Sequence, residues 1–501
     1  MSQRSLKPLF SLSWQSFAYG IGILGRQVVI YLTLPLFTNF MPQTEYGVVA
    51  VFVSTLALVN TLTNAGLQAA TFRFYNDTFD EQTRRYTISS SLLLFFLFAT
   101  FFSFTILLGA ESISQVILGS VDYVPTIRVL AVLLVIETLI NFGYILLRLQ
   151  IRPYATSLHN IVLIVAQAGL ALLFVRVYNW GATGYFLGYL GGALLGLGVM
   201  VWLVRHMLVF QVSAKRLKEL MIYGLPIIPA DLSMWALRLA DRSLVASMVG
   251  LDQVAVYEIG YKIGLMVGLA FMPFNAAWPP FAFATMHKPN APEIYRNVLT
   301  YIASGYTFLA LGVIAFRSDL TKFLVPPSYA HAVSVVPWVA VSQIFLGLYP
   351  VLSLGPKIKK QTGPLAWVAF SAAIANILLN ILLIPWIGIL GAAVATLVGY
   401  LLLAVIGYSV GQRYFPIPLD WMRLGKLALA SGLTIIVILV VGRLPLSDWE
   451  GRILRALSLL IYPLLLIAVR FITPTQARET WQMISNKLYK QFGGELTTRV
   501  P

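Results

Sequence analysis

The residues with the greatest chemical capability in this sequence lie inside long apolar stretches, where polar side chains are rare and costly. In the first stretch, spacings of four, three, four and seven residues separate Gln15, Tyr19, Gly22, Arg26 and Thr33. A helix turns by about 100° per residue, so this spacing places all five on one narrow face. Because a lipid-facing surface would not carry such a stripe, the pattern predicts a hydrated cavity beside it.

Acidic and basic residues are interleaved in a later apolar stretch. Spacings of four, three and four residues separate Asp231, Trp235, Arg238 and Arg242, and Asp241 stands directly beside the last of them. Neighbouring residues of a helix point about 100° apart. We therefore expect that Asp241 and Arg242 do not satisfy each other, and that at least one of them faces another helix or the cavity.

A third charged group consists of Glu258 and Lys262, which are one helical turn apart. This spacing favours a pair of opposite charges that neutralise each other in a helix interface. Asp231, Asp241 and Glu258 are also candidates to carry a coupling proton or sodium ion, and a role in salt bridges is the alternative.

Arginine dominates the predicted binding chemistry. Its planar guanidinium donates two parallel hydrogen bonds to a phosphate and stays charged at physiological pH. We predict that Arg26, Arg238 and Arg242 face the cavity and contact an anion, with charge pairing between packed helices as the alternative. The predicted substrate-binding set is completed by Lys262, Gln15, Asn64 and Asn376, and further polar residues in the apolar stretches are Asn60, Glu137, Asn141, Tyr144, Arg148, Asn160, Gln167 and Asn380.

Signatures of an enzyme or a bound cofactor are missing from the sequence. The four histidines lack the spacing of metal ligands, and no acidic cluster on a loop offers a hydrolytic site. Residues 20–25 match a dinucleotide fingerprint, but no strand precedes them, and close helix packing explains the glycines. We predict no enzyme, no metal and no cofactor, and a proton or sodium gradient rather than ATP as the energy source.

The composition places the chain in a membrane. Of 501 residues, 58% are hydrophobic and 11% are charged, against roughly 25% charged in soluble domains. The net charge of +16 does not indicate nucleic acid, because the basic residues form small clusters between apolar runs. A spanning helix needs about 20 apolar residues. Fourteen predicted spans cover residues 12–40, 47–70, 87–110, 126–149, 155–176, 181–204, 221–249, 254–283, 297–316, 332–354, 364–384, 388–410, 427–443 and 453–472.

The basic residues predict how these helices are oriented. If the N-terminus is cytoplasmic, twenty-three Lys and Arg residues fall in inside segments and seven in outside segments. Cytoplasmic loops carry an excess of this kind. Both termini are therefore predicted to be cytoplasmic.

Internal repetition predicts two lobes. The stretch Gly181–Leu190 has a counterpart in Gly391–Leu401, and basic loops repeat at a similar offset. Six helices per repeat is an even number, so the halves share one orientation, as in parallel-repeat transporters. We predict an all-α polytopic fold, with the parts being a first lobe (1–204), a cytoplasmic linker with a short basic helix (205–222), a second lobe (223–412), two added helices (413–472) and an amphipathic cytoplasmic tail (473–501).

Motifs in both lobes occur in a recognisable order. They are Glu45-Tyr46-Gly47, Gly66-Leu67, Tyr223–Ala230, Asp241-Arg242, Val256-Tyr257-Glu258, Ala277–Phe281 and the segment from Asn376 to Ala393. Together they resemble the bacterial polysaccharide flippases of the multidrug/oligosaccharidyl-lipid/polysaccharide (MOP) exporter superfamily, over most of residues 10–410. The resemblance implies a MATE-like fold in the bacterial inner membrane. It also implies export of an undecaprenyl-diphosphate-linked oligosaccharide, as in O-antigen and lipopolysaccharide synthesis.

The residues and the resemblance lead to one mechanistic hypothesis. The diphosphate and sugars enter a cavity between the lobes, the lipid tail stays in the bilayer, and rocking of the lobes exposes the headgroup outside. The partners are then the lipid-linked oligosaccharide, membrane lipids and other polysaccharide-assembly proteins. Prolines interrupt backbone hydrogen bonds, and the candidate bending points are Pro35, Pro226, Pro229 and Pro273.

Two other functions fit parts of the sequence. A cation-coupled multidrug exporter would share the fold, but its cationic substrates favour an acidic rather than an arginine-rich cavity. A membrane-embedded glycan polymerase or ligase would carry a long external loop with catalytic residues. The longest predicted outside segment, 317–331, is short and sparse in such residues.

Overall fold

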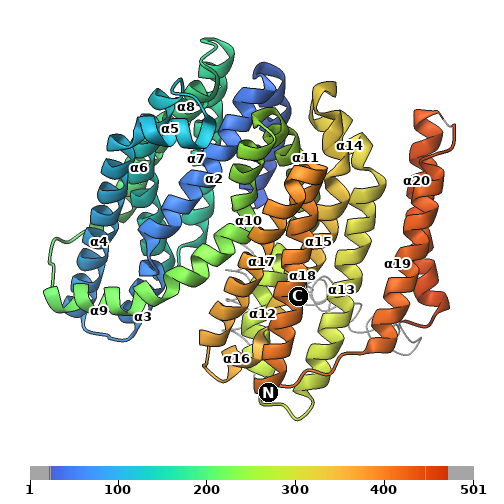
Figure 1. The fold of residues 1–501 in the computed structure, drawn as a ribbon. Helices are drawn as coiled ribbons and strands as arrows, with labels where there is room; N and C mark the ends of the chain where they lie inside the picture. Colours follow the sequence, from blue (N-terminus) through green and yellow to red (C-terminus); the bar gives the residue numbers. More distant parts are fainter. Residues whose placement is uncertain (1–21, 23, 446, 472–501) are drawn as a thin grey trace, which may run out of the picture.

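The computed structural model describes residues 22, 24–445 and 447–471, which form helices and contain no strand (Figure 1). This confirms the predicted all-α class. The first described helix covers residues 24–40. The first half then continues with α2 (Gln43–Asn64), α3 (Leu67–Asn76), α4 (Glu81–Leu108), α5 (Ala110–Leu118), α6 (Val124–Leu149), α7 (Pro153–Arg176), α8 (Gly181–Val204) and η1 (Arg205–Met207).

The second half is also helical throughout its described part. It consists of α9 (Ala214–Gly224), η2 (Leu225–Ile227), α10 (Ile228–Met248), α11 (Leu251–Leu269), α12 (Met272–Thr285), α13 (Ala291–Ala315), α14 (Arg317–Leu324), η3 (Pro327–Ser334), α15 (Val336–Leu352), α16 (Leu354–Ile358), α17 (Gly363–Ile387), α18 (Ile389–Tyr414), α19 (Trp421–Val441) and α20 (Asp448–Ala468). The predicted amphipathic tail, 473–501, lies outside the described residues.

Within the described residues, twelve helical segments are long and apolar enough to cross a membrane. The chain is therefore a multi-pass membrane protein. The eighth predicted span is not among the twelve, because α11 carries Asp252, Glu258 and Lys262 within 19 residues. The first predicted span begins at residue 12 and lies partly outside the described residues. The count of fourteen stays a prediction.

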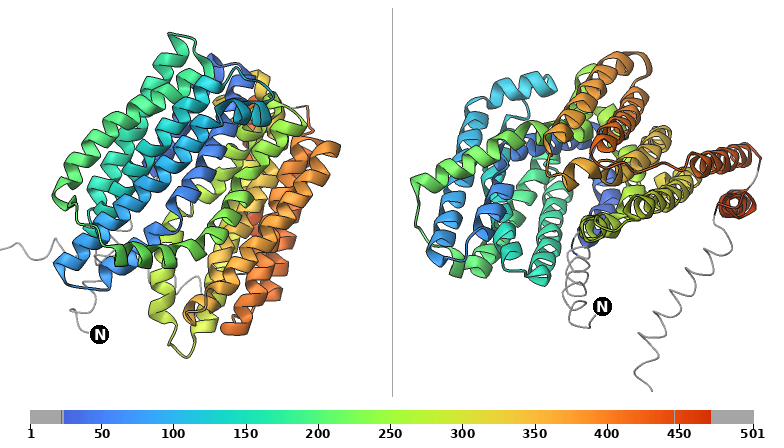
Figure 2. Two further views of the ribbon diagram at one scale, coloured as in Figure 1. Left: turned by 60° about the vertical axis from the view of Figure 1, so that its left-hand side comes forward. Right: turned by 90° about the horizontal axis from the view of Figure 1, so that it is seen from below.

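The helices gather in two groups that stand side by side (Figures 1 and 2). The first lobe is formed by the helix over 24–40 and by α2 to α8, and the second by α10 to α18. Among α2 to α8, helix α2 packs most extensively against the second lobe, where it contacts α10 and α11. Helices α19 and α20 stand at the edge of the second lobe and pack against α13.

The repeated sequence stretches occupy matching places in the two lobes. Gly181 begins α8, and Gly391 lies in the first turn of α18. Each of these helices packs along the helix before it, α8 on α7 and α18 on α17. The sequence repeat therefore corresponds to a repeated helix pair.

Prolines mark breaks between helices, as predicted at three of four positions. Pro226 lies in the short turn η2, Pro229 in the first turn of α10, and Pro273 in the first turn of α12. Each proline lacks a backbone N–H, so a preceding helix is not continued through it. Pro35 differs, because the helix over 24–40 runs through it.

One break was not predicted. The second predicted span is divided into α2 and α3. Ala65 and Gly66 join these helices in left-handed conformations, with φ of 43° and 67°. A side chain at Gly66 would collide with the backbone of Gly224, the last residue of α9. Glycine therefore allows the bend of α2 into α3 to rest directly on the bend between α9 and α10.

The predicted linker contains the expected short basic helix. This helix is α9, which packs against α3 and α4 of the first lobe. Arg216 of α9 pairs with Glu219 at 2.7 Å. The linker is therefore attached to the first lobe, and the path into the second lobe begins at η2.

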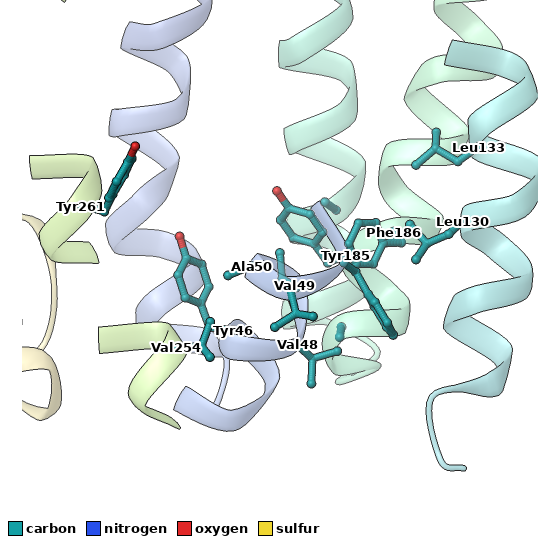
Figure 3. Close-up of a cluster of buried hydrophobic side chains, with 14 of the residues drawn as sticks. Tyr46, Val48, Val49, Ala50, Leu130, Leu133, Tyr185, Phe186, Val254 and Tyr261 are labelled. Carbon is teal, nitrogen blue, oxygen red and sulfur yellow. The ribbon is translucent and has the colours of Figure 1, made fainter. Parts of the chain in front are cut away.

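An apolar layer joins the lobes at the end of the molecule where α2 and α11 begin (Figure 3). It contains Val48 of α2, Leu133 of α6 and Phe186 of α8, which are at most 1% exposed, together with Val254 of α11. At the same end, Gly47 touches the carbonyl group of Leu251, where any side chain would collide. We call this layer the apolar plug. The opposite end carries the loops rich in Lys and Arg, and we call it the basic end.

Candidate functional site

Two adjoining cavities lie inside the first lobe. One has a volume of about 200 Å³ and is lined by Arg26, Asn60, Glu137, Ile140, Asn141, Tyr144, Asn160, Leu163, Ile164 and Gln167. The other has a volume of about 300 Å³ and is lined by Asn60, Thr61, Thr63, Asn64, Gln68, Phe95, Thr138, Asn141, Tyr144, Ile145 and Arg148. They share three residues, so we name them together the first-lobe cavity. It is bounded by the helix over 24–40, α2, α3, α4, α6 and α7.

The first described helix presents Arg26 to this cavity. On the same helix, Val28, Leu32 and Leu36 are spaced by four residues and are 56%, 66% and 41% exposed, so they form a lipid-facing side. Arg26 is two positions from Val28, about 200° around the helix, and so points away from that side. Arg26 is exposed and forms no salt bridge with another described residue. The structure thus places Arg26 on a cavity inside the first lobe, whereas the predicted cavity lay between the lobes.

Two hydrogen-bonded pairs fix part of the cavity wall. The amide of Asn60 donates to the carboxylate of Glu137 at 3.3 Å. Nε2 of His159 donates to the carbonyl oxygen of Gly196 at 2.9 Å. The neutral ring therefore has a bare Nδ1, which accepts the hydroxyl hydrogen of Tyr144 at 2.9 Å. His159 thus orients Tyr144 and leaves its hydroxyl oxygen free to accept a hydrogen bond.

The second lobe holds a network of four charged residues between α10 and α11, the second-lobe charge network. Arg242 is 2% exposed and contacts Asp241 at 2.6 Å and Glu258 at 3.0 Å. The expectation that Asp241 and Arg242 do not satisfy each other is wrong. The long arginine side chain folds back, so its Nη1 reaches both Asp241 and the carbonyl oxygen of Arg238. Arg242 is therefore enclosed by acceptors of its own lobe.

Lys262 completes this network and reaches across to the first lobe. Its ammonium lies 3.3 Å from Glu258, which confirms the predicted pair, and donates to the hydroxyl of Tyr46 on α2 at 2.8 Å. Its backbone carbonyl accepts the hydroxyl hydrogen of Tyr31 at 2.6 Å. Two tyrosines of the first lobe therefore bond to Lys262. The network holds two cations and two carboxylates and is balanced in charge.

Tyrosines surround the acids and bases of the network. Tyr257 donates its hydroxyl to Asp241 at 2.5 Å, and Thr396 of α18 donates to the same carboxylate at 3.3 Å. The guanidinium of Arg242 lies 4.0 Å from the ring centre of Tyr261. A buried charge needs such partners to replace water. Tyr46, Tyr257 and Tyr261 were not predicted as site residues. The sequence did contain a signal, because Tyr46 and Tyr257 belong to family motifs and Tyr261 lies one helical turn after Glu258.

Arg238 differs from Arg242 although the two lie on one face of α10. Its side chain is exposed and forms no salt bridge within the described part of the chain. One turn before it, Trp235 donates to the carbonyl oxygen of Ser54 on α2 at 3.0 Å. One turn after it, Arg242 contacts α11. Arg238 therefore lies at the junction of the two lobes with its guanidinium unpaired.

The remaining predicted residues are distributed over several environments. Asn64 lines the first-lobe cavity. Asn376 is 1% exposed and accepts a hydrogen bond from Asn380 at 3.2 Å, inside α17, so it is packed between helices rather than on a described cavity. Asp231 is half-buried in the first turn of α10, where the helix N-terminus favours a negative charge. Gln15 lies outside the described residues.

The structure therefore brings the predicted residues together in two groups rather than one. Arg26 and Asn64 meet at the first-lobe cavity, and Arg242, Lys262, Asp241 and Glu258 meet in the charge network. The sequence named Glu137, Asn141, Asn160 and Gln167 as polar residues in apolar stretches but did not assign them to the site. Their spacing on α6 and α7 was the signal, since Glu137, Asn141 and Tyr144 share one helix face.

Comparisons with known proteins identify the family of this chain. A sequence model of a family described as polysaccharide biosynthesis protein matches residues 14–286. An uncharacterized membrane protein of Methanocaldococcus jannaschii is 22% identical over 432 residues, covering 79% of this chain and 82% of that protein. That relative is also described as a membrane protein.

Solved structures share the fold. The lipid II flippase MurJ in an inward closed conformation is 15% identical, with a TM-score of 0.72, and the match covers 90% of this chain and 98% of that one. An inward-facing multidrug resistance MATE family transporter of the MOP superfamily is 16% identical, with a TM-score of 0.61, over 77% of this chain and 94% of that one. The chain belongs to the polysaccharide biosynthesis protein family and has the fold of the MOP superfamily, as its motifs predicted.

Proposed function

We propose that this protein is a flippase that moves a polyprenyl-diphosphate-linked oligosaccharide across the cytoplasmic membrane for cell-surface polysaccharide synthesis, O-antigen included. The observation that carries the proposal is the separation of its cations. Arg242 and Lys262 are neutralised by Asp241 and Glu258, whereas Arg26 and Arg238 are exposed and unpaired within the described chain. Two free guanidinium groups suit a diphosphate, which is an acceptor at every oxygen.

The position of the free arginines also supports this substrate. Arg26 lines the first-lobe cavity, and Arg238 lies where the two lobes meet. A single phosphate-binding residue would serve many anions, but a pair of arginines from opposite lobes suits a diphosphate held between them. The polyprenyl tail stays in the bilayer, because transfer of its apolar surface into water is unfavourable.

The conformation supports alternating access. The lobes are packed together at the apolar plug, while Asn141 and Arg148 of the first-lobe cavity are exposed, and Arg148 lies in the last turn of α6 at the basic end. With the basic end facing the cytoplasm and both termini inside, this arrangement admits the headgroup from the cytoplasmic leaflet. Separation of the lobes at the plug then releases it on the other side. A proton or sodium gradient is the proposed energy source, and Asp231 is a carboxylate that no described cation pairs with.

A cation-coupled drug exporter is the second candidate, and Glu137 is the observation that favours it. This carboxylate lines the first-lobe cavity and has an amide rather than a cation as its hydrogen-bond partner. An acidic cavity attracts cationic substrates. Arg26 and Arg148 line the same cavity, so the positive charges there outnumber the negative one.

The test is to replace Arg26 and Arg238 by alanine together and measure flipping of a fluorescent polyprenyl-diphosphate oligosaccharide in proteoliposomes. Charge-assisted hydrogen bonds contribute about 1.5–3 kcal/mol each, so the double variant should lose at least about 100-fold in rate. Arg128→Ala is the matched control, because Arg128 is an exposed arginine of α6 outside the described cavities. Normal flipping in the double variant, or export of a cationic dye by the unchanged protein, would contradict the proposal.

A further inference from the structure

The first-lobe cavity is rich in side-chain amides. Six carboxamides line it, from Asn60, Asn64, Gln68, Asn141, Asn160 and Gln167. Amide side chains inside a membrane protein are expensive unless they are hydrogen-bonded. Their concentration in one cavity therefore points to a ligand or to ordered water.

Four of these amides, those of Gln68, Asn141, Asn160 and Gln167, have no side-chain hydrogen-bond partner among the described residues. Asn60 is held by Glu137, and Asn64 accepts a hydrogen bond from the backbone of Gln68 at 3.2 Å. Within the described chain, the side chains of Asn141, Asn160 and Gln167 form no hydrogen bond, although Gln167 is 4% exposed. These three amides, from α6 and α7, are left to bond with whatever occupies the cavity.

The kind of ligand follows from the chemistry of a carboxamide. Each amide has two N–H donors and one carbonyl acceptor. A phosphate offers acceptors alone and an ammonium offers donors alone, so neither would satisfy the amides fully. A sugar hydroxyl both donates and accepts, and neighbouring hydroxyls on a pyranose ring do so side by side. Neutral sugar residues match the amide set better than either charged group does.

Two more features of the cavity suit a sugar. Tyr144 is fixed by His159 and keeps a free acceptor on its hydroxyl oxygen, and Phe95 gives the cavity an apolar surface for C–H groups. The two adjoining volumes, about 200 and 300 Å³, together fall in the range of small-molecule sites. Arg26 at one border would hold the phosphate from which the sugars extend.

We infer that the first-lobe cavity is a sugar subsite, in which Asn141, Asn160 and Gln167 select the first neutral hexose or N-acetylhexosamine residues of the lipid-linked glycan. This inference rests on the proposed flippase function. It assigns glycan selectivity to the first lobe and leaves recognition of the diphosphate to Arg26 and Arg238. The amides of the first lobe would then recognise the sugars, while Arg26 of the first lobe and Arg238 of the second recognise the diphosphate.

The experiment measures binding of two kinds of lipid to the full-length protein in nanodiscs. The first is a short-chain polyprenyl diphosphate without sugar, and the second is the same lipid carrying glucose, galactose or N-acetylglucosamine. We expect the unchanged protein to bind at least one glycosylated lipid about tenfold or more tightly than the bare lipid. Asn141→Leu with Asn160→Leu should reduce this ratio to near one and leave binding of the bare lipid intact.

Control variants make the outcomes distinct. Asn39→Leu changes an exposed amide at the other end of the first described helix and should keep the ratio. Arg26→Ala should weaken binding of bare and glycosylated lipids alike. An unchanged ratio in the Asn141 and Asn160 double variant, or no sugar preference in the unchanged protein, would overturn the sugar subsite while leaving the flippase proposal standing. Failure to bind any of the lipids would instead contradict the flippase proposal.

A cation site is the remaining alternative occupant. If sodium ions, and not sugars, bind the purified protein and this binding is lost in Glu137→Gln, the amides serve a cation and the sugar subsite is wrong. If sugar preference persists in Glu137→Gln at constant sodium, the sugar assignment gains direct support. Circular dichroism and monodisperse elution of each variant would establish that it is folded before binding is compared.

Discussion

The two lobes use the same kinds of polar residue in opposite ways. In the second-lobe charge network, Arg242 is 2% exposed and every charge has a partner of opposite sign. In the first-lobe cavity, Arg26 and Asn141 are exposed, and four of the six side-chain amides have no hydrogen-bond partner in the described chain. The charges of the network are all paired within the protein, as expected of a structural element. The polar groups of the cavity lack such partners, as expected of a binding site.

This difference shows that a charge inside a membrane protein does not by itself indicate a site. Burying an ion is unfavourable unless partners replace its water. Where the protein supplies the partners, as for Arg242, the donors of the side chain are already bonded and do not bind a ligand. Where they are missing, as for Arg26 and Arg238, the ligand or water must supply them. We therefore propose that the charge network contributes to stability and that the unpaired arginines bind the substrate.

The largest effect is expected from Arg242→Ala. The change would leave Asp241 without its cation and Glu258 with Lys262 alone, and breaking a buried ion pair costs about 3–5 kcal/mol. We expect a large fall in thermal stability in detergent, or failure to accumulate in the membrane. Arg238→Ala, one turn earlier on the same helix face, should change stability by less than about 0.5 kcal/mol because its side chain is exposed. Equal losses in both variants would show that the division into structural and free arginines is wrong.

A smaller effect is expected from removing the contact between the network and the first lobe. Tyr46→Phe deletes the hydroxyl that accepts from Lys262, and one hydrogen bond contributes about 1 kcal/mol. The population with the plug open should therefore rise by about fivefold. The chain has no cysteine, so Val48→Cys, buried in the plug, gives a single site whose alkylation reports opening.

The matched control for this measurement is Tyr329→Phe. Tyr329 contacts the ring of Tyr46 from η3, but its buried hydroxyl has no hydrogen-bond partner in the described structure. Removing that hydroxyl should leave the alkylation rate of Val48→Cys unchanged or lower it. The same rise in both variants would mean that the hydrogen bond to Lys262 does not hold the lobes together.

Reasoning from the sequence predicted the helices and their faces better than it predicted which side chains contact one another across helices. Helix periodicity placed Arg26 on a cavity face and paired Glu258 with Lys262, because those inferences depend on angles along one helix. It could not separate Arg238 from Arg242, which share a face. Their difference arises from α11, which brings Glu258 against Arg242, and from the rotamer that returns its guanidinium to Asp241. The bend at Gly66 was also missed, since its cause is the backbone of Gly224, far away in sequence.

The smallest effect is expected from Glu137→Gln, which tests the one acid of the first-lobe cavity. The amide of glutamine keeps an acceptor for Asn60 and removes the negative charge, so the wall of the cavity is preserved. For a substrate that carries a diphosphate and neutral sugars, we expect flipping in proteoliposomes to change by less than about threefold. An exporter of cations would need this carboxylate and would lose most of its transport. A severe loss of flipping would mean that the acid takes part in coupling, so that the first-lobe cavity serves an ion as well as the cargo.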